Sequence, residues 1–569
     1  MKRFFAILSI LLATIAVTTA QSTYKSALGV KMPKGATIYG TVECDGKPVE
    51  GVVVTDGKEV VKTDKKGVYA IKSTKRNGQV YITIPSGYET PCSEGEPVPQ
   101  FWAELKEEPS VAERHDFVLK RVDNRRHVIL AVGDPQLSNR LDDVRQFEEN
   151  VMPRIREEVE RYRSQGIAVY TLSMGDSSFD TYWYDCLFNI DSYRQLLKRC
   201  NYPTTYFNTM GNHDNDLATP YDENTDFNAA EPYRRAFGPT YYSFNLGDVH
   251  YVMLDNIIYI NNPDKGKERY RIGITQEQLD WLARDLAFVE DKATPVVVGM
   301  HSPVFNYKNH LGGEVVCRLG DENGAAFTKL LQPFERVTIL SGHTHRNYVC
   351  YCREDSLHTE WHNISEHTVN ALSGARWYPN AIGGPSLDVR GAPSSFKVFD
   401  WAGRDVKWYT VSIDYGREKQ FMAFDGNEMR RFFAESGEYK AFRKHFPRRT
   451  DYGSSEVLAD NVVMLSVWDY ANDWKVEVYE NGKPLKVERH RMEHPLQLLF
   501  YDVPRSTWRG DYQSKSRRKR SWNNNMFLVQ CSSADSTLEI VVTDTFGNKF
   551  TEIMERPRSF SRGVFLQKR

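Results

Sequence analysis

The pattern of apolar and polar positions divides the chain into three parts. Residues 36–120 hold short segments of alternating polarity separated by Asp-Gly and Lys-Gly turns, which predicts the strands of a small β-sandwich. Residues 127–373 hold continuous apolar runs separated by segments of helical periodicity, which predicts buried strands and connecting helices in an α/β arrangement. Beyond residue 373 the strand-like pattern returns, with one helical insert near residues 428–446.

The beginning of the chain has a different pattern. Lys2 and Arg3 precede the apolar residues 4–17 and three small residues at positions 18–20. A basic start, a short apolar run and a small-residue exit are typical of a cleaved secretory signal, and the run is shorter than the ~20 residues of a spanning helix. We therefore expect an exported protein, periplasmic or extracellular, with no membrane span in the mature chain. An uncleaved N-terminal anchor is the alternative.

These changes of pattern predict the domain organisation: a signal peptide at residues 1–20, an N-terminal β-sandwich at 21–122, an α/β domain at 123–385 and a C-terminal β-rich domain at 386–569. The composition, with 40% apolar and 26% charged residues, is globular and excludes a wholly disordered or collagenous chain. The 74 basic and 75 acidic side chains nearly cancel, which argues against a protein whose main task is electrostatic capture of nucleic acid.

Each of five apolar runs in the α/β region is followed directly by residues of metal-binding type. In chain order the runs end in Gly133-Asp134-Pro135-Gln136, Gly175-Asp176, Gly211-Asn212-His213-Asp214, Met300-His301 and Gly342-His343-Thr344-His345. In an open α/β sheet the functional site lies beyond the carboxyl ends of the strands. Parallel strands would therefore bring the five loops together at one site.

The chemistry of these side chains indicates which metals they would bind. Histidine, carboxylate and amide ligands suit borderline or hard divalent ions such as Mn, Zn or Fe, and there are too many of them for one tetrahedral zinc. They match two metal ions about 3.5–4 Å apart that share a carboxylate. His343 and His345 are separated by one residue, so both rings can point to the same side of an extended segment.

The order of the five motifs resembles that of the calcineurin-like metallophosphoesterase superfamily over residues 126–377. The resemblance implies an α/β (α+β) four-layer sandwich of two mixed sheets flanked by helices, with a dinuclear site at the strand ends. The flanking regions resemble the accessory domains of a secreted bacterial subfamily, and residues 40–71 resemble small transthyretin-like or carboxypeptidase-regulatory-like β-sandwiches.

The resemblance implies a role for each motif residue. Six of them would hold the two metal ions: Asp134 and His345 the first, Asn212, His301 and His343 the second, and Asp176 both. His213 would face the scissile phosphate and Asp214 would orient it. Many members have His at the position of Gln136, whose carbonyl is a weaker, uncharged ligand. This departure would either shift the metal choice towards Mn or Fe or lower the affinity of the first site, and it leaves open whether Gln136 binds metal at all.

The implied activity is hydrolysis of a phosphomonoester or phosphodiester. A metal-bridging hydroxide would attack the phosphorus, and protonated His213 would donate to the leaving oxygen as general acid. The alternative is a catalytically weak or degenerate member that acts as a secreted binding module, for which Gln136 is the only support in the sequence. The substrate is a phosphoester whose identity the sequence leaves open.

Three further features leave two interpretations open. Residues 505–520 are strongly basic with interleaved aromatics, which fits either a phosphate-rich partner or, in our preferred interpretation, a solvated hairpin loop. Asp180, Trp183 and Tyr184 follow the second motif, and Trp377 follows the last; each could line the site or belong to the core. His127 and His250 lie within apolar strands and are predicted to be structural.

Overall fold

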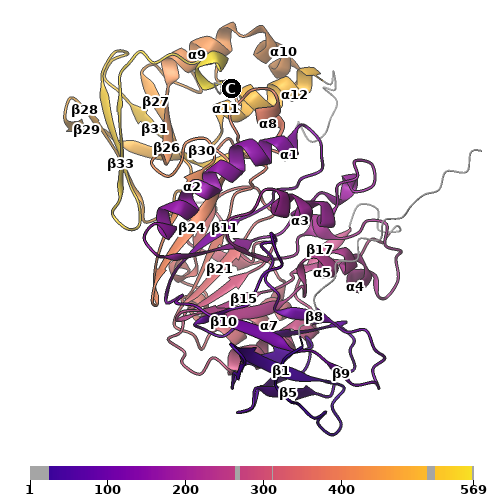
Figure 1. The fold of residues 1–569 in the computed structure, drawn as a ribbon. Coiled ribbons are helices and arrows are strands. Elements are labelled where there is room, and N and C mark those ends of the chain that lie inside the picture. The colour runs from indigo at the N-terminus through magenta and orange to yellow at the C-terminus, as the bar shows by residue number, and fades with distance from the viewer. Residues whose placement is uncertain (1–24, 263–268, 310–311, 509–519, 567–569) are drawn as a thin grey trace, which may run out of the picture.

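The computed structural model describes residues 25–262, 269–309, 312–508 and 520–566. The signal predicted at residues 1–20 lies outside these residues, as does most of the basic segment (509–519). None of the described helices combines the length and the apolar composition that a membrane span requires. Figure 1 shows the N-terminal strands at one end of the molecule, the C-terminal strands and helices at the other end, and the region with the five motifs between them.

The N-terminal region consists of two facing sheets of short strands. One has the order β2-β1-β10-β7, with β5 and β9 also paired to β1, and the other has the order β4-β3-β6-β8. The strands are β1 (Ile38–Cys44), β2 (Lys47–Pro48), β3 (Val53–Thr55), β4 (Val60–Lys62), β5 (Val68–Ile71), β6 (Gln79–Ile82), β7 (Tyr88–Glu89), β8 (Trp102–Glu104), β9 (Glu113–Arg114) and β10 (Phe117–Arg121). This agrees with the strand pattern of the sequence.

The middle region contains two mixed sheets. The first has five strands in the order β13 (Thr205–Asn208), β12 (Ala168–Ser173), β11 (Arg126–Val132), β24 (Ser395–Ala402) and β25 (Asp405–Ser412). The second has six, in the order β14 (Tyr242–Leu246), β15 (Val249–Met253), β18 (Val296–Gly299), β21 (Val337–Ser341), β23 (Ile364–Thr368) and β22 (Tyr348–Tyr351). The five apolar runs thus fall in two sheets, three in the first and two in the second.

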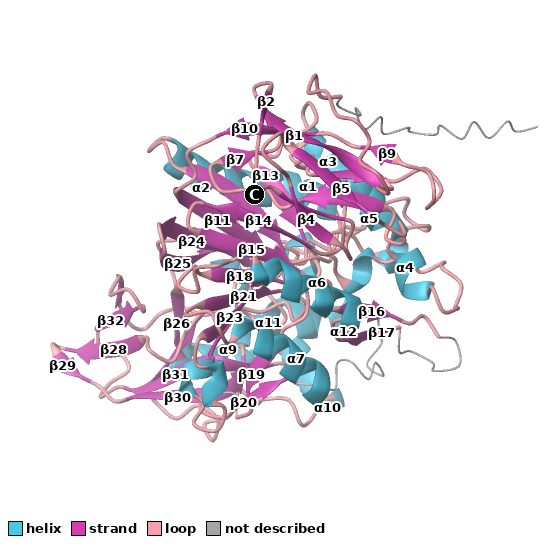
Figure 2. Ribbon diagram, turned by 90° about the horizontal axis from the view of Figure 1, so that it is seen from below, coloured by secondary structure: helices cyan, strands magenta, loops and turns pink. Residues whose placement is uncertain are grey.

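Helices surround the two sheets of the middle region (Figure 2). They are α1 (Asp143–Gln146), α2 (Met152–Arg163), α3 (Ile190–Arg199), α4 (Thr225–Ala229), α5 (Glu231–Phe237), α6 (Gln276–Ala287), α7 (Asp321–Leu331) and α8 (Tyr378–Ala381). A π-helical turn at residues 147–151 joins α1 to α2 within the predicted helical stretch 141–163. Two hairpins complete the region: β16 (Ile257–Tyr259) with β17 (Tyr270–Ile272), and β19 (Phe305–Tyr307) with β20 (Val315–Cys317).

The side chains of β11 show how four layers form. Val128, Leu130 and Val132 pack with helices α2 and α3 on one face, whereas Ile129 and Ala131 pack against the second sheet on the other. Successive residues of a strand point to opposite faces, so burial on both sides explains a continuous apolar run. Helices α6 and α7 share the core of the second sheet. The order helix, sheet, sheet, helix confirms the four-layer fold expected from the sequence.

The C-terminal region adds two four-stranded sheets. Their orders are β26 (Phe421–Asp425), β27 (Val462–Val467), β31 (Trp522–Gln530), β30 (Val487–Glu493) and β29 (Lys483–Pro484), β28 (Lys475–Glu480), β32 (Leu538–Thr543), β33 (Lys549–Met554). The helices are α9 (Gly426–Glu435), α10 (Gly437–His445), α11 (Pro495–Gln497), α12 (Val503–Trp508) and α14 (Arg562–Phe565), so the predicted insert is two helices. Strand β24 lies within residues 386–569 and yet pairs with β11, and β25 pairs with β24; the domain boundaries themselves remain predictions.

Candidate metal centre

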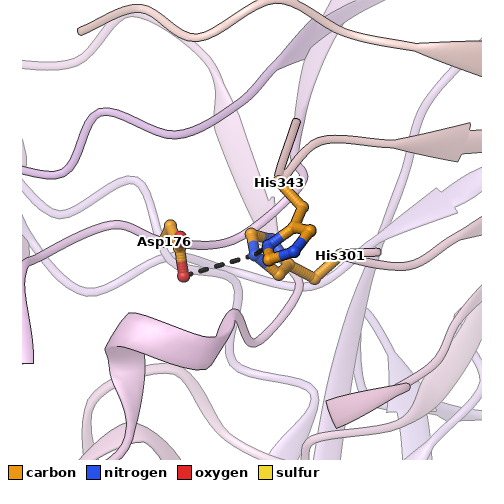
Figure 3. A group of neighbouring side chains, drawn as sticks. All are labelled: Asp176, His301 and His343. Atoms are coloured by element: carbon orange, nitrogen blue, oxygen red, sulfur yellow. Dashed lines mark hydrogen bonds and ion pairs between the residues drawn. The ribbon is translucent and has the colours of Figure 1, made fainter. Parts of the chain in front are cut away.

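The loops that follow β11, β12, β13, β18 and β21 meet at the strand ends of the two sheets. Two groups of possible ligand atoms are present, and within each group all the atoms lie within 4.8 Å of one another. One group comes from Asp176, His301 and His343, and the other comes from Asp134, Asp176 and His345. Asp176 belongs to both groups, as a carboxylate shared by two ions would. Figure 3 shows the first group, with the Asp176 carboxylate directed at the two imidazole rings.

The backbone at these loops adopts conformations that side-chain-bearing residues rarely take. Asp134, Gln136, Asp176, His343 and His345 all have positive φ, between 42° and 63°. Such conformations cost free energy and persist only where the surrounding structure enforces them, which is typical of functional sites. The five outliers belong to the predicted ligand set, so the fold holds these residues in strained positions that bring their side chains together.

Two glycines allow the ligand loops to approach closely. A Cβ atom on Gly211 would overlap the backbone nitrogen and a carboxylate oxygen of Asp176, and a Cβ on Gly175 would lie 3.0 Å from Nδ1 of His301. The side chain of any other residue at position 211 would therefore displace the shared carboxylate. This explains why glycine precedes the ligands at these two strand ends.

His301 is fully buried, and its ring orientation is set by a backbone carbonyl. Its Nδ1–H donates to Met174 O at 2.6 Å, which leaves the lone pair of Nε2 directed at the centre. Around Nε2 lie Oδ1 of Asn212 at 3.0 Å, Nδ1 of His343 at 3.1 Å and Oδ1 of Asp176 at 3.4 Å. Burial lowers the pKa of His301, but the Asp176 charge outweighs it and raises the pKa to about 10. The surroundings thus favour a positive charge here, which fits a bound cation.

The second group is arranged in the same way. The Nδ1–H of His345 points to Gly374 O at 3.3 Å, and its Nε2 lies 3.4 Å from Oδ1 of Asp134. Gln136 donates from Nε2 to Asp176 Oδ2 at 2.9 Å, while its Oε1 is buried without a hydrogen-bond partner among the described residues. An unpartnered buried carbonyl is costly unless something binds it, so Gln136 lies within the site and offers an oxygen to it. The donor set as a whole fits two divalent ions.

His213 lies at the edge of this group, and its partner differs from the expected one. Its Nδ1 is 2.6 Å from Oδ1 of Asp180, and its backbone N–H donates to Asp176 at 2.7 Å. Burial lowers the pKa of His213, but the charges of Asp176 and Asp180 outweigh this effect and raise it. Asp180 therefore orients the ring, which leaves its Nε2 as the atom that can reach a substrate.

Asp214 has a different task from the one expected from the sequence. Its two carboxylate oxygens accept from the backbone N–H groups of Gly211, Ser177 and Ser178, at 2.9, 2.9 and 3.2 Å. Asp214 is fully buried, and burial together with the Asp176 charge raises its pKa to about 7. The expectation that Asp214 orients His213 is corrected: Asp214 fastens the loop that carries Asp176 to the loop that carries Asn212.

Residues that follow the last motif complete the surroundings of His213. Arg376 and Trp377 have φ of 58° and 63°, and Trp377 donates from Nε1 to Pro135 O at 2.9 Å, which ties this loop to the first motif. Arg376 is exposed and lies over the ring of Phe179, which in turn contacts the edge of His213. The sequence raised Asp180 and Trp377 as candidates without deciding between site and core, and it carried no signal for Arg376.

The histidines predicted to be structural are buried at the other end of the sheets. The ring of His127 lies between Asn124 O at 3.0 Å and the Tyr251 hydroxyl at 2.7 Å. His250 lies between Asn245 and Asp285, both at 2.9 Å. Both rings have two hydrogen-bond partners within the core and take no part in the centre.

Three family models match the chain. The model described as calcineurin-like phosphoesterase matches residues 127–347, which hold all five motifs. The models for the N terminal and the C terminal of calcineurin-like phosphoesterase match residues 36–122 and 366–550. The chain belongs to the calcineurin-like phosphoesterase family. The resemblance drawn from the motif order is thereby confirmed.

Similar proteins include plant enzymes. The chain is 29% identical over 163 residues to purple acid phosphatase 22 and 31% identical over 143 residues to purple acid phosphatase 15, both of Arabidopsis thaliana. These matches cover 27% and 24% of this chain but only 33% and 23% of the two relatives. A dimetal phosphatase from Danio rerio is structurally similar over 51% of this chain and 96% of its own, with a TM-score of 0.31 and 14% identity.

Proposed function

We propose that the chain is a dinuclear metal-dependent hydrolase of phosphate esters. The observation that carries the proposal is the pair of ligand groups that share Asp176 while His213, held by Asp180, lies at their edge. Two divalent ions bound there would neutralise phosphoryl oxygens and lower the pKa of bound water. Asp134, His345 and Asp176 would hold one ion, and Asn212, His301, His343 and Asp176 the other.

The residues of the chain supply what the ions do not. His213 is protonated more readily than an ordinary histidine because Asp176 and Asp180 lie beside it, so it is suited to donate a proton from Nε2 to the leaving oxygen. Asp180 accepts from Nδ1 and fixes the ring, a positioning role. Exposed Arg376 adds a positive charge on the same side as His213, where it can hold the phosphoester.

A substrate profile with metal-restored protein tests the proposal. Purified protein loaded with Mn²⁺ or Zn²⁺ is assayed on p-nitrophenyl phosphate and on bis-p-nitrophenyl phosphate, which differ in being a monoester and a diester. His213→Ala should lower kcat by about 10²–10⁴-fold on an ester with an alkoxide leaving group while two metals remain bound. A stoichiometric dinuclear site with no turnover on any ester would instead favour the binding module.

We also propose that the protein is exported. This rests on the basic, apolar and small residues at positions 1–20 of the sequence. Mass spectrometry of the N-terminus of protein recovered from a cell fractionation would test it, since a protein that starts at its first Met in the cytoplasm would contradict the proposal.

A further inference from the structure

Four arginines from distant parts of the sequence lie within electrostatic reach of one another. They are Arg318, Arg346, Arg390 and Arg491. Burial, followed by the positive charges of Arg346 and Arg491, lowers the pKa of Arg390 to about 9, and Arg318 acts on Arg346 in the same direction. Like charges repel, so a cluster of this kind is unfavourable unless negative charge is close to it.

Arg346 connects this cluster to the metal centre. It follows the ligand His345 directly, and its Nη2 lies 3.4 Å from Oδ1 of Asn306, which comes five residues after the ligand His301. Its guanidinium lies 5.3 Å from the centre of the Tyr348 ring. The Nε of Arg346 is buried and has no hydrogen-bond partner among the described residues. This buried N–H group is therefore available to an anion from outside the chain.

The cluster also contains the carboxylate of Asp388, which accepts hydrogen bonds from its own loop. Oδ1 of Asp388 accepts from the backbone N–H groups of Arg390 and Ala392, at 2.7 and 3.0 Å, and Oδ2 accepts from Asn370 at 3.3 Å. Burial raises the pKa of Asp388 to about 7, although the N–H groups that it accepts from and the charge of Arg390 act to lower it, and it is a single carboxylate among four arginines. Among the described residues no side-chain oxygen forms a hydrogen bond or an ion pair with the guanidinium of Arg390, although the charge of Asp388 acts on it. The positive charges of the cluster therefore exceed its negative charge.

A strand of the C-terminal sheets holds the backbone of Arg390 in place. Asn523 of β31 donates from Nδ2 to the backbone oxygen of Arg390 at 3.2 Å. Gly391, with φ of 87°, lies against the ring of His494 so closely that a Cβ atom would overlap it. Arg491 of β30 lies over the ring of Trp522 at 5.3 Å and faces the same cluster. Strands β30 and β31 therefore complete the cluster, since β30 supplies Arg491 and β31 fixes the backbone of Arg390.

We propose that Arg346, Arg390 and Arg491 form an anion subsite, which binds a second anionic group of the substrate while the scissile phosphate lies at the metal centre. The group is a phosphate or a carboxylate, because guanidinium groups bind both through paired charge-assisted hydrogen bonds. Arg346 and Arg390 are half-buried and Arg318 is exposed, so a solute can reach them. This inference rests on the proposed function, and it names the substrate class as phosphoesters with a second negative charge.

Two matched substrate pairs test the inference on the Mn²⁺-loaded full chain. Fructose 1,6-bisphosphate is compared with fructose 6-phosphate, and 3-phosphoglycerate with glycerol 3-phosphate, so the pairs differ by a phosphate and a carboxylate respectively. The wild-type KM should be at least tenfold lower for the doubly anionic member of one pair. Arg390→Gln and Arg346→Gln should abolish that preference and leave kcat/KM on p-nitrophenyl phosphate within twofold. Arg199→Gln, an exposed arginine paired with Glu148, is the matched control.

Inorganic sulfate provides a readout that does not depend on turnover. Sulfate should raise the Tm of the wild type more than that of Arg390→Gln, because the metal centre contributes equally to both proteins. If p-nitrophenyl phosphate is hydrolysed but neither pair shows a preference, the inference is overturned and the proposed function stands. If no ester is hydrolysed, the proposed function fails, and an equal sulfate effect on both proteins would then overturn the anion site as well.

Discussion

The assignment of Asp180 as the residue that positions His213 leads to a specific kinetic prediction. In Asp180→Asn the shape of the side chain is kept and its charge is removed, at a position that is only 2% exposed. Asn can still accept from Nδ1 of His213, but it no longer stabilises the protonated ring. Asp176 retains its own charge beside the ring, so the pKa of His213 should fall but should still be raised by this second carboxylate.

The size of the effect follows from the type of bond that is lost. The contact from Nδ1 to Oδ1 is 2.6 Å long and joins two groups that carry opposite charges when His213 is protonated. Hydrogen bonds to charged groups contribute about 1.5–3 kcal/mol, and each 1.4 kcal/mol corresponds to a factor of ten in rate. We therefore expect kcat to fall by about ten- to one-hundred-fold where proton donation limits the reaction.

The assay compares two leaving groups. An alkyl ester such as glycerol 3-phosphate expels an alkoxide, a strong base that needs a proton, whereas p-nitrophenolate is a weak base that leaves without one. Asp180→Asn should lower kcat on the alkyl ester by the full factor and on p-nitrophenyl phosphate by much less. The controls are Asp216→Asn, the same change on the neighbouring loop, and Arg269→Gln, which removes the ion pair at 3.5 Å between the exposed Arg269 and Asp180. Both should stay within about twofold.

Two results would refute the reasoning. An equal loss on both esters would mean that Asp180 acts on something other than proton donation. A fall in bound metal in Asp180→Asn, measured by elemental analysis, would mean that it supports the ligands and not His213.

Three further predictions concern the metal centre and the stability of the fold. Gly211→Ala should reduce metal content and activity because its Cβ would overlap Asp176, and normal metal content in this variant would contradict the close packing of Gly211 on Asp176. Gly437→Ala, at a position with no atom within 4 Å of the added Cβ, is the control and should change neither. Lys397→Met should destabilise the protein by about 3–5 kcal/mol in urea unfolding, because the buried carboxylate of Asp469, 2.9 Å from Lys397 Nζ, loses its charged partner. Adding Asp469→Leu should recover much of the loss, and additive effects of the two changes would show that the pair is not coupled. Burial lowers the pKa of His127 to about 4 from an unfolded value near 6.5, so the unfolded chain takes up the proton first. The free energy of unfolding should therefore fall by on the order of 3 kcal/mol as the pH decreases from 6.5 to 4. His127→Gln should lose this part of the acid sensitivity in urea titrations at several pH values, and an unchanged pH dependence would contradict the prediction.

The sequence alone predicted which residues gather at the candidate metal centre and which fold carries them. The apolar runs of β11, β12, β13, β18 and β21 are long enough to be recognised as buried strands, and each ends in a motif whose residue types already indicate metal binding. Both features can be recognised from short stretches of sequence, because the burial of a strand and the chemistry of the loop that follows it depend on neighbouring residues. The four-layer fold and the family followed from the order of these motifs.

Only the tertiary structure decided which side chains serve one another. Asp214 is adjacent to His213 in sequence, yet its oxygens face backbone amides, because the loop turns there and brings Asp180 to the ring instead. The partner of a buried polar group depends on which loops pack against it, and the residue sequence near the group does not encode that. The cluster of Arg346, Arg390 and Arg491 is a stronger case: 145 positions separate its first and last members, from 346 to 491, and the C-terminal sheet brings them together. Long-range packing, not local pattern, assembled this charge.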